Sequence, residues 1–98
     1  MKTIFSLHKV FHYNNHVIRA EKRSLFITME YSLIIDDAKQ DQILGSYGIL
    51  VMHGALGNDE NRKPVKIVIK QRIFRTWFYC LIDNQKCLME DYYPDEFK

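Results

Sequence analysis

The sequence predicts an α+β fold, in which an N-terminal strand and one or two helices pack on a C-terminal antiparallel β-meander of about four strands. Apolar residues between positions 16 and 38 recur at spacings that suit helices. From residue 45 onward, apolar residues instead alternate with polar ones or form short β-branched and aromatic runs, as strands do. Helices grouped before strands favour helices on one face of the sheet. At 98 residues, we expect a single domain over residues 1–98.

The first half is predicted as a strand followed by helices. Residues 3–13 place most apolar and polar side chains on opposite parities, which indicates a short strand that ends at Asn14. Over residues 16–38 we predict two helices with a break near residues 24–27, or alternatively one continuous helix. The buried stripes would be Val17, Ile18 and Ala20, then Met29, Leu33 and Ile34. The charged residues of the first helix would face solvent: Arg19, Glu21, Lys22 and Arg23.

Four strands are predicted in the second half, over residues 47–55, 65–70, 73–82 and 87–93. The turn at residues 56–63 contains Gly57-Asn58-Asp59, which are residue types that tolerate the positive φ of hairpin turns. A second turn is predicted at residues 83–86. The run at 73–82 is nearly all β-branched or aromatic, so it should be a central strand of the meander.

Composition excludes several classes of protein. With 47% hydrophobic residues and a net charge of +2, the chain is too apolar and too nearly neutral for a disordered tail. No apolar run approaches the roughly 20 residues of a membrane-spanning helix, and the N-terminus lacks the apolar core of a signal peptide. We therefore expect a cytoplasmic protein without a membrane partner, in which Cys80 and Cys87 are reduced. The absence of a CxxC spacing predicts no metal site, and no motif indicates a cofactor.

The charges are segregated along the chain. Residues 62–75 contain six cations and no acid, whereas five acids follow from residue 83 onward. Because strand side chains alternate with a period of two, Lys66 and Lys70 share a face, and Arg72 joins them if the strand continues. Such a face suits phosphate groups. Alternatively it is only the solvent-exposed side of an antiparallel sheet, or the acidic end of the chain neutralises it.

A second basic cluster lies nearer the N-terminus. On the predicted helix, Arg19 and Arg23 are four residues apart and share a face with His16, which lies three residues before Arg19. Two guanidinium groups beside an imidazole can hold a phosphate and exchange a proton near neutral pH. The alternative is an exposed basic helix face without a ligand.

This segment resembles the N-terminal signature of a small domain family of unknown function, the DUF4258 type. In that family a His is followed by an Arg, by a second Arg four residues on, and then by a small and an aliphatic residue. The comparable positions here are His16, Arg19, Arg23, Ser24, Leu25 and the closing Tyr92-Tyr93-Pro94. Ser24 replaces the usual glycine, and the His–Arg spacing is three where four is commoner. The family resembles the RelE/ParE toxin superfamily, which has two N-terminal helices on a curved antiparallel sheet.

The resemblance implies a small toxin-type protein that binds or cleaves RNA and is controlled by a partner antitoxin. Metal-independent RNA cleavage needs a base, a cation for the phosphate and a proton donor. The catalytic candidates are then His16 or His53 as base, Arg72 as phosphate-binding cation, and Tyr92 or Tyr93 as proton donor. The candidate RNA-binding residues are Arg19, Arg23, Lys66, Lys70, Arg72 and Arg75.

A structural role for each of these side chains is the competing interpretation, since tyrosines usually lie in cores or at rims. The alternative function is a non-enzymatic protein–protein interaction module that uses its sheet edge and aromatic surface. Exposure of any part of Trp77-Phe78-Tyr79 would support that module, because aromatic residues are enriched at interfaces. A DNA-binding regulator is less well supported, because no recognition-helix pattern stands out. The oligomeric state is not predicted.

Overall fold

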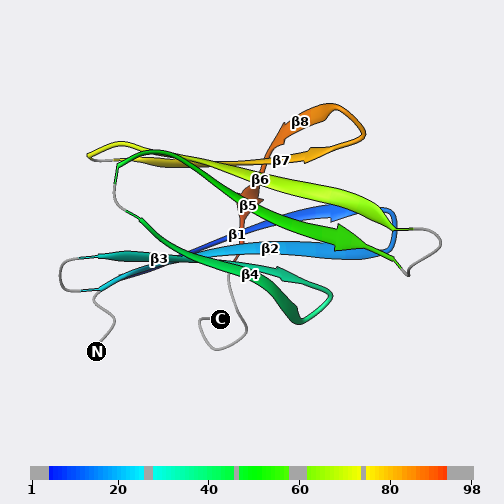
Figure 1. Cartoon of the computed structure of the whole chain (residues 1–98), viewed down its shortest axis with the longest axis horizontal. Helices are drawn as coiled ribbons and strands as arrows, with labels where there is room; N and C mark the ends of the chain where they lie inside the picture. The colour runs from blue at the N-terminus through cyan, green and yellow to red at the C-terminus, as the bar shows by residue number, and fades with distance from the viewer. Residues whose placement is uncertain (1–4, 26–27, 46, 58–61, 74, 93–98) are drawn as a thin grey trace.

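The chain folds into two antiparallel β-sheets that stack face to face (Figure 1). The computed structural model describes residues 5–25, 28–45, 47–57, 62–73 and 75–92, and within these ranges it contains nine strands and no helix. The strands are β1 (Phe5–Tyr13), β2 (His16–Ser24), β3 (Met29–Ile35), β4 (Ala38–Gly45), β5 (Gly48–Leu56), β6 (Lys63–Gln71), β7 (Thr76–Ile82), β8 (Gln85–Leu88) and β9 (Glu90–Asp91). The described part of the protein is therefore all-β.

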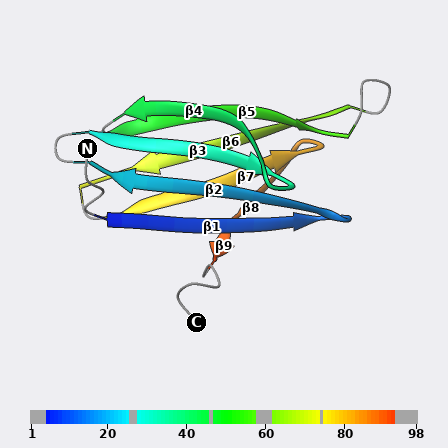
Figure 2. The same ribbon diagram turned by 90° about the horizontal axis from the view of Figure 1, so that it is seen from below.

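The strands follow one another around the core almost in chain order. The first sheet has the order β4-β3-β2-β1-β9, and the second sheet has the order β5-β6-β7-β8. Only β9 departs from this order, because it returns to pair with β1. Between β8 and β9 the chain passes from one sheet to the other at Met89, whose side chain is buried and whose backbone N–H donates to the Phe78 carbonyl at 2.9 Å. Figure 2 shows the first sheet in front, with β9 at its edge.

The predicted α+β class is wrong, because residues 16–38 form β2, β3 and the turn to β4 instead of helices. The two helices that the family resemblance implied are likewise missing from the described residues. A four-residue spacing fits a helix turn, but it is also twice the period of a strand. Ile18, Ala20 and Lys22 face inward on β2 by that shorter period. The strand pairing with β1 and β3 selects the extended conformation.

Two of the hairpins are connected by two-residue turns built from Asp and Asn. Asp36 and Asp37 both have positive φ, at 49° and 68°, and they join Ile35 to Ala38 across the tight turn between β3 and β4. Asp83 and Asn84 do the same between β7 and β8, where a turn was predicted. Asp and Asn are the non-glycine residues that best tolerate this backbone conformation. The pair Asp36-Asp37 therefore ends a strand where the helical interpretation continued.

The predicted C-terminal meander forms as β5 to β8, with two shifts. The strand expected over residues 73–82 begins at Thr76, and the last expected strand is divided between β8 and β9. Tyr93 and Pro94 lie outside the described residues, as do residues 58–61 of the long turn and residues 26–27 of the expected helix break. No helix in the described part of the chain is long and apolar enough to cross a membrane.

The core lies between the two sheets and draws on both. Its buried members are Ile18, Ala20, Tyr31, Leu33, Ile35, Met52, Leu56, Val65, Ile67, Ile69, Phe78, Cys80, Ile82 and Met89. Burying each large aliphatic or aromatic side chain contributes roughly 1.5–3 kcal/mol, so this cluster is the main source of stability. In β6 and β7 its residues alternate strictly with outward-facing ones, which fixes which side chains reach solvent.

Side chains of β4 close the seam between the sheets. The Gln40 amide accepts a hydrogen bond from the Ala55 N–H at 2.8 Å and donates to the Ala55 carbonyl at 3.1 Å. Asp41 Oδ2 accepts the His53 N–H at 2.8 Å. A Cβ at Gly54 would lie 2.8 Å from Gln40 Oε1, so glycine is what permits this close approach. The edge of β5 is thereby covered over residues 53–55.

Candidate nucleic-acid interface

The outward side of the second sheet, called here the outer face, combines aromatic and cationic side chains. On β7, Phe78 is buried in the core, whereas Trp77 and Tyr79 point the opposite way and are only partly covered. On β6, Lys66 and Lys70 point to the same side. The sequence-based prediction that these two lysines share a face is therefore confirmed by the strand geometry.

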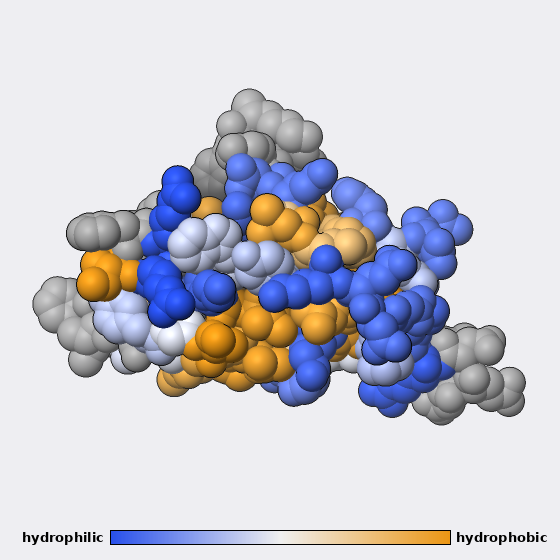
Figure 3. All heavy atoms as spheres, turned by 90° about the horizontal axis from the view of Figure 1, so that it is seen from above, coloured by the Kyte–Doolittle hydropathy of each residue, from blue (hydrophilic) through white to orange (hydrophobic). Residues whose placement is uncertain are grey.

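Register places these side chains in rows across the sheet. Trp77 lies opposite Lys70, and Tyr79 lies opposite Val68 and Leu88. The next row contains Leu81 with its two neighbours Lys66 and Lys86. Strand β5 extends the rows through Ile49, Val51 and His53. Figure 3, which looks onto this side of the molecule, shows hydrophobic and hydrophilic side chains interleaved over it.

Cations lie directly against the two aromatic rings. The Lys86 Nζ is 4.4 Å from the centroid of the Tyr79 ring, and the Arg75 guanidinium carbon is 5.9 Å from that of Trp77. Such contacts are favourable because the ring face carries negative charge. They also place positive charge beside each ring, where the phosphate of a stacked nucleotide would benefit from it.

No acid neutralises the outer face among the described residues. Between Gly48 and Leu88, Asp83 is the sole described acid, and its carboxylate accepts hydrogen bonds from Tyr13 and Lys63 at one end of the sandwich. Lys66, Lys70, Arg75 and Lys86 form no ion pair with any described residue. Their charge is therefore available to a polyanion.

The six predicted RNA-binding cations divide between opposite sides of the protein. Lys66, Lys70 and Arg75 belong to the outer face, and Arg72 is exposed just beyond the end of β6. Arg19 and Arg23 lie on β2 in the other sheet and share its outward side, but on a strand and not on the predicted helix. Their ion-pair partners there are Asp37 and Glu30, each at 3.4 Å. The two basic clusters do not converge.

The four catalytic candidates also lie apart. His53 is exposed on β5, opposite Lys66, whereas Arg72 is six residues from Lys66 along the chain, which is roughly 20 Å in an extended strand. Tyr92 packs under the Arg19 guanidinium of the first sheet, 5.5 Å from ring centroid to carbon. His16, at the start of β2, has the opposite parity to Arg19 and so leaves the proposed arginine clamp.

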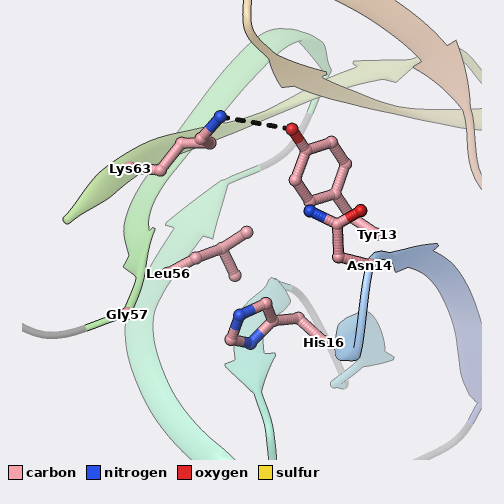
Figure 4. Close-up of a pocket in the computed structure, with 6 residues that line it drawn as sticks. All are labelled: Tyr13, Asn14, His16, Leu56, Gly57 and Lys63. Atoms are coloured by element: carbon pink, nitrogen blue, oxygen red, sulfur yellow. Dashed lines mark hydrogen bonds between the residues drawn. The ribbon is translucent and has the colours of Figure 1, made fainter. Parts of the chain in front are cut away.

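His16 borders a small cavity of about 180 Å³ at one end of the sandwich (Figure 4). Its Nδ1 lies 2.6 Å from Asp36 Oδ2, and this hydrogen bond holds the pKa of Asp36 below its ordinary value. Across the cavity, Lys63 Nζ donates to Asp83 at 2.7 Å and to the Tyr13 hydroxyl at 3.2 Å. The first of these bonds raises the pKa of Lys63 and lowers that of Asp83. The polar groups at this cavity therefore pair with one another, His16 with Asp36 and Lys63 with Asp83, and these contacts join the ends of neighbouring hairpins.

Sequence reasoning missed Lys86 as a member of the outer face. The signal was present, because Lys86 is the second residue after the Asp83-Asn84 turn and must therefore face the same way as Leu81. Sequence reasoning did name the run Trp77-Phe78-Tyr79 as support for an interaction surface, on the condition that part of this run is exposed. That condition holds for both rings, which are partly exposed, but not for Phe78, which is buried.

Comparison with protein-family models, with curated proteins and with solved structures finds no match for this chain. Nor do the described residues contain a group of three or more His, Cys, Asp or Glu placed to hold a metal ion. The DUF4258-type resemblance and the toxin-like activity it implies stay predictions. Inference about function rests on the chemistry of the outer face.

Proposed function

We propose that this protein binds single-stranded RNA on the outer face of β5 to β8. The observation that carries the proposal is the pair of outward rings, Trp77 and Tyr79, beside cations on a face without described acids. Bases stack on aromatic side chains whatever their identity, and lysines and arginines attract the backbone. Rings two residues apart on one strand are separated by roughly 6.8 Å, which leaves room for bases of an unstacked strand.

Binding, and not cleavage, is the activity that this geometry supports. The candidate base, phosphate-binding cation and proton donor would have to lie within hydrogen-bond reach of one phosphodiester. His53 and Arg72 instead lie roughly 20 Å apart along the second sheet, and Tyr92 belongs to the first. A cytoplasmic location suits an RNA ligand and the two free thiols, Cys80 and Cys87. The antitoxin partner that the resemblance implies stays a prediction.

Fluorescence anisotropy with a labelled twelve-nucleotide uridine RNA tests the proposal. Trp77→Ala and Tyr79→Ala should each weaken binding by about 5- to 150-fold, the equivalent of roughly 1–3 kcal/mol per stacked base. Tyr92→Ala is the matched control, because Tyr92 is also a tyrosine beneath a cation but lies on the other sheet. Equal loss in the control, or no loss in the two outer-face variants, would refute the proposal.

A protein-binding role for the same face is the second candidate. Ile49 and Leu88 are 65% and 59% exposed, which is typical of interface residues. Strand addition cannot use residues 53–55 of β5, because Gln40 and Asp41 already bond to that backbone. Among the described strands of the second sheet, this leaves residues 48–52 of β5 and the edge of the four-residue β8. Charge-independent binding of a peptide strand, with no RNA binding, would favour this candidate.

A further inference from the structure

The two cysteines of the chain lie directly opposite each other on neighbouring strands. Cys80 is on β7 and Cys87 is on β8, and the register of this antiparallel pair makes them Cα partners. Residues opposite each other in an antiparallel pair share a face of the sheet, so Cys87 points to the interior side, as Cys80 does. Cys80 is buried and Cys87 is partly exposed, and both thiols are free. Both residues also line one small cavity of about 10 Å³.

The pattern of strand pairing sets the distance between these two residues. The Phe78 carbonyl accepts the Met89 N–H at 2.9 Å, which makes Phe78 and Met89 a hydrogen-bonded pair. Such pairs recur at every second residue of a ladder, so Cys80 and Cys87 form another, with Cα atoms roughly 5.5 Å apart. Disulfides most often have a Cα separation of roughly 5.5–6 Å. The Cβ atoms of cross-strand neighbours lie roughly 4.5–5.5 Å apart, so closing a disulfide requires the strands to approach by about 1 Å.

Strand β8 is placed so that it can make this movement. It is four residues long and lies at the edge of the second sheet, with β7 as its one pairing partner among the described strands. Cys87 is its partly buried residue, and the other three residues of β8 are exposed. An edge strand with so few packing contacts belongs to the part of a fold that opens and shifts most readily.

We propose that Cys80 and Cys87 are an oxidative modification site, at which hydrogen peroxide converts the two thiols into a reversible disulfide that joins β8 covalently to β7. Cys87 reacts first, because it is the cysteine that solvent reaches. Its sulfur attacks the peroxide, the O–O bond breaks, and Cys87 becomes a sulfenic acid while one water leaves. The Cys80 sulfur then attacks the Cys87 sulfur, so that the S–S bond forms, the S–O bond breaks, and the departing hydroxide takes the Cys80 proton as a second water. The two thiols lose two electrons in total, and these reduce the peroxide to water.

Cys80 reacts because of where it is held. Burial raises the pKa of the Cys80 thiol to about 12, and the nearby Cys87 adds to this shift. Only roughly one Cys80 thiol in 10⁴ to 10⁵ is therefore ionised near neutral pH. A group held beside its target compensates for this, because its effective concentration can reach about 10⁵ M. The same burial keeps Cys80 from reacting with peroxide itself or with a second chain, so the expected product is the disulfide within one chain.

Treatment of the reduced full chain with hydrogen peroxide tests the proposal, with intact-mass analysis and maleimide labelling of the denatured product as readouts. We expect both thiols to be lost together, the mass to fall by two hydrogen atoms, and the chain to stay monomeric on a non-reducing gel. Dithiothreitol should restore both thiols. Hydrogen–deuterium exchange of the β8 amides should be slower in the oxidised chain than in the reduced one, because the new bond holds this edge strand on β7.

Cys80→Ala and Cys87→Ala are matched variants that separate the two roles. In Cys80→Ala, peroxide should leave a sulfenic acid at Cys87 that dimedone traps as an adduct. In Cys87→Ala, the buried Cys80 should stay a free thiol under the same conditions, and this variant serves alone should Cys80→Ala fail to fold. The proposal is overturned in the unmodified chain by a covalent dimer as the main product, by oxidised Cys87 beside a free Cys80, by two unreacted thiols, or by unchanged exchange of β8. Both sulfurs lie on the opposite side of the sheet from the outer face, so none of these outcomes depends on RNA binding.

Discussion

The RNA binding proposed above predicts a salt dependence whose size can be calculated from the cations of the outer face. Four cations lie on it, Lys66, Lys70, Arg75 and Lys86. If each neutralises one phosphate of a single strand, the logarithm of the binding constant should fall with the logarithm of salt concentration with a slope of about −2.8, which is −0.7 for each contact. Replacing Lys66 and Lys70 with Gln removes two contacts and should reduce the slope to about −1.4.

These slopes predict a clear difference in affinity. Between 50 and 200 mM KCl, the unmodified chain should lose about 50-fold in affinity, and the Lys66→Gln/Lys70→Gln variant about 7-fold. Anisotropy of the labelled uridine RNA at five salt concentrations measures both slopes. Arg19→Gln/Lys39→Gln is the matched control, because it removes two charges from the first sheet. A slope that falls equally in the control, or that stays unchanged in the outer-face variant, refutes the reasoning.

Two further predictions concern stability. Gly54→Ala should lower the free energy of unfolding by about 1–3 kcal/mol, and the melting temperature by roughly 4–8 °C per kcal/mol, because the added Cβ would lie 2.9 Å from the buried Leu33 side chain; an unchanged or higher melting temperature would contradict this. The bond to Lys63 lowers the pKa of Asp83 from 3.8. The stability that this pair contributes is therefore present above pH 3.8, and it is lost as the pH falls through the lower pKa of Asp83 in the folded state. Asp83→Asn should therefore flatten the loss of stability below about pH 4, measured as the urea midpoint from pH 2 to 7, and an unaltered profile would count against the pairing.

The second half of the fold could be predicted from sequence because its signals agree. Alternation in Val65–Lys70, the aromatic run before Ile82 and the Asp83-Asn84 turn all indicate strands and a hairpin, and β6 to β8 follow them. The face shared by Lys66 and Lys70 follows from the same alternation. In this half, local preference and tertiary pairing point the same way.

The prediction for the first half of the chain failed because its apolar pattern fits both the helical and the strand period. Tertiary contacts decide between the two. Lys22 has Glu21 and Arg23 as neighbours, so the helical interpretation placed it in solvent. Strand parity instead groups it with Ile18 and Ala20, on the inside. The sequence carried the correct signal in Asp36-Asp37, a left-handed pair that ends a hairpin strand. The burial of Lys22 could not be anticipated without that correction.

The sheets also explain why the net charge of +2 was a poor guide to function. On the first sheet, three cations are matched by acids: Lys9 with Asp91, Arg19 with Asp37, and Arg23 with Glu30. The described acids near the C-terminus, Glu90 and Asp91, pair with β1 and not with the basic strand β6. They therefore neutralise the first sheet and leave the cations of the outer face without acid partners among the described residues. Charge segregation along the sequence becomes charge segregation between two sheets, and only the second presents a surface that attracts a polyanion.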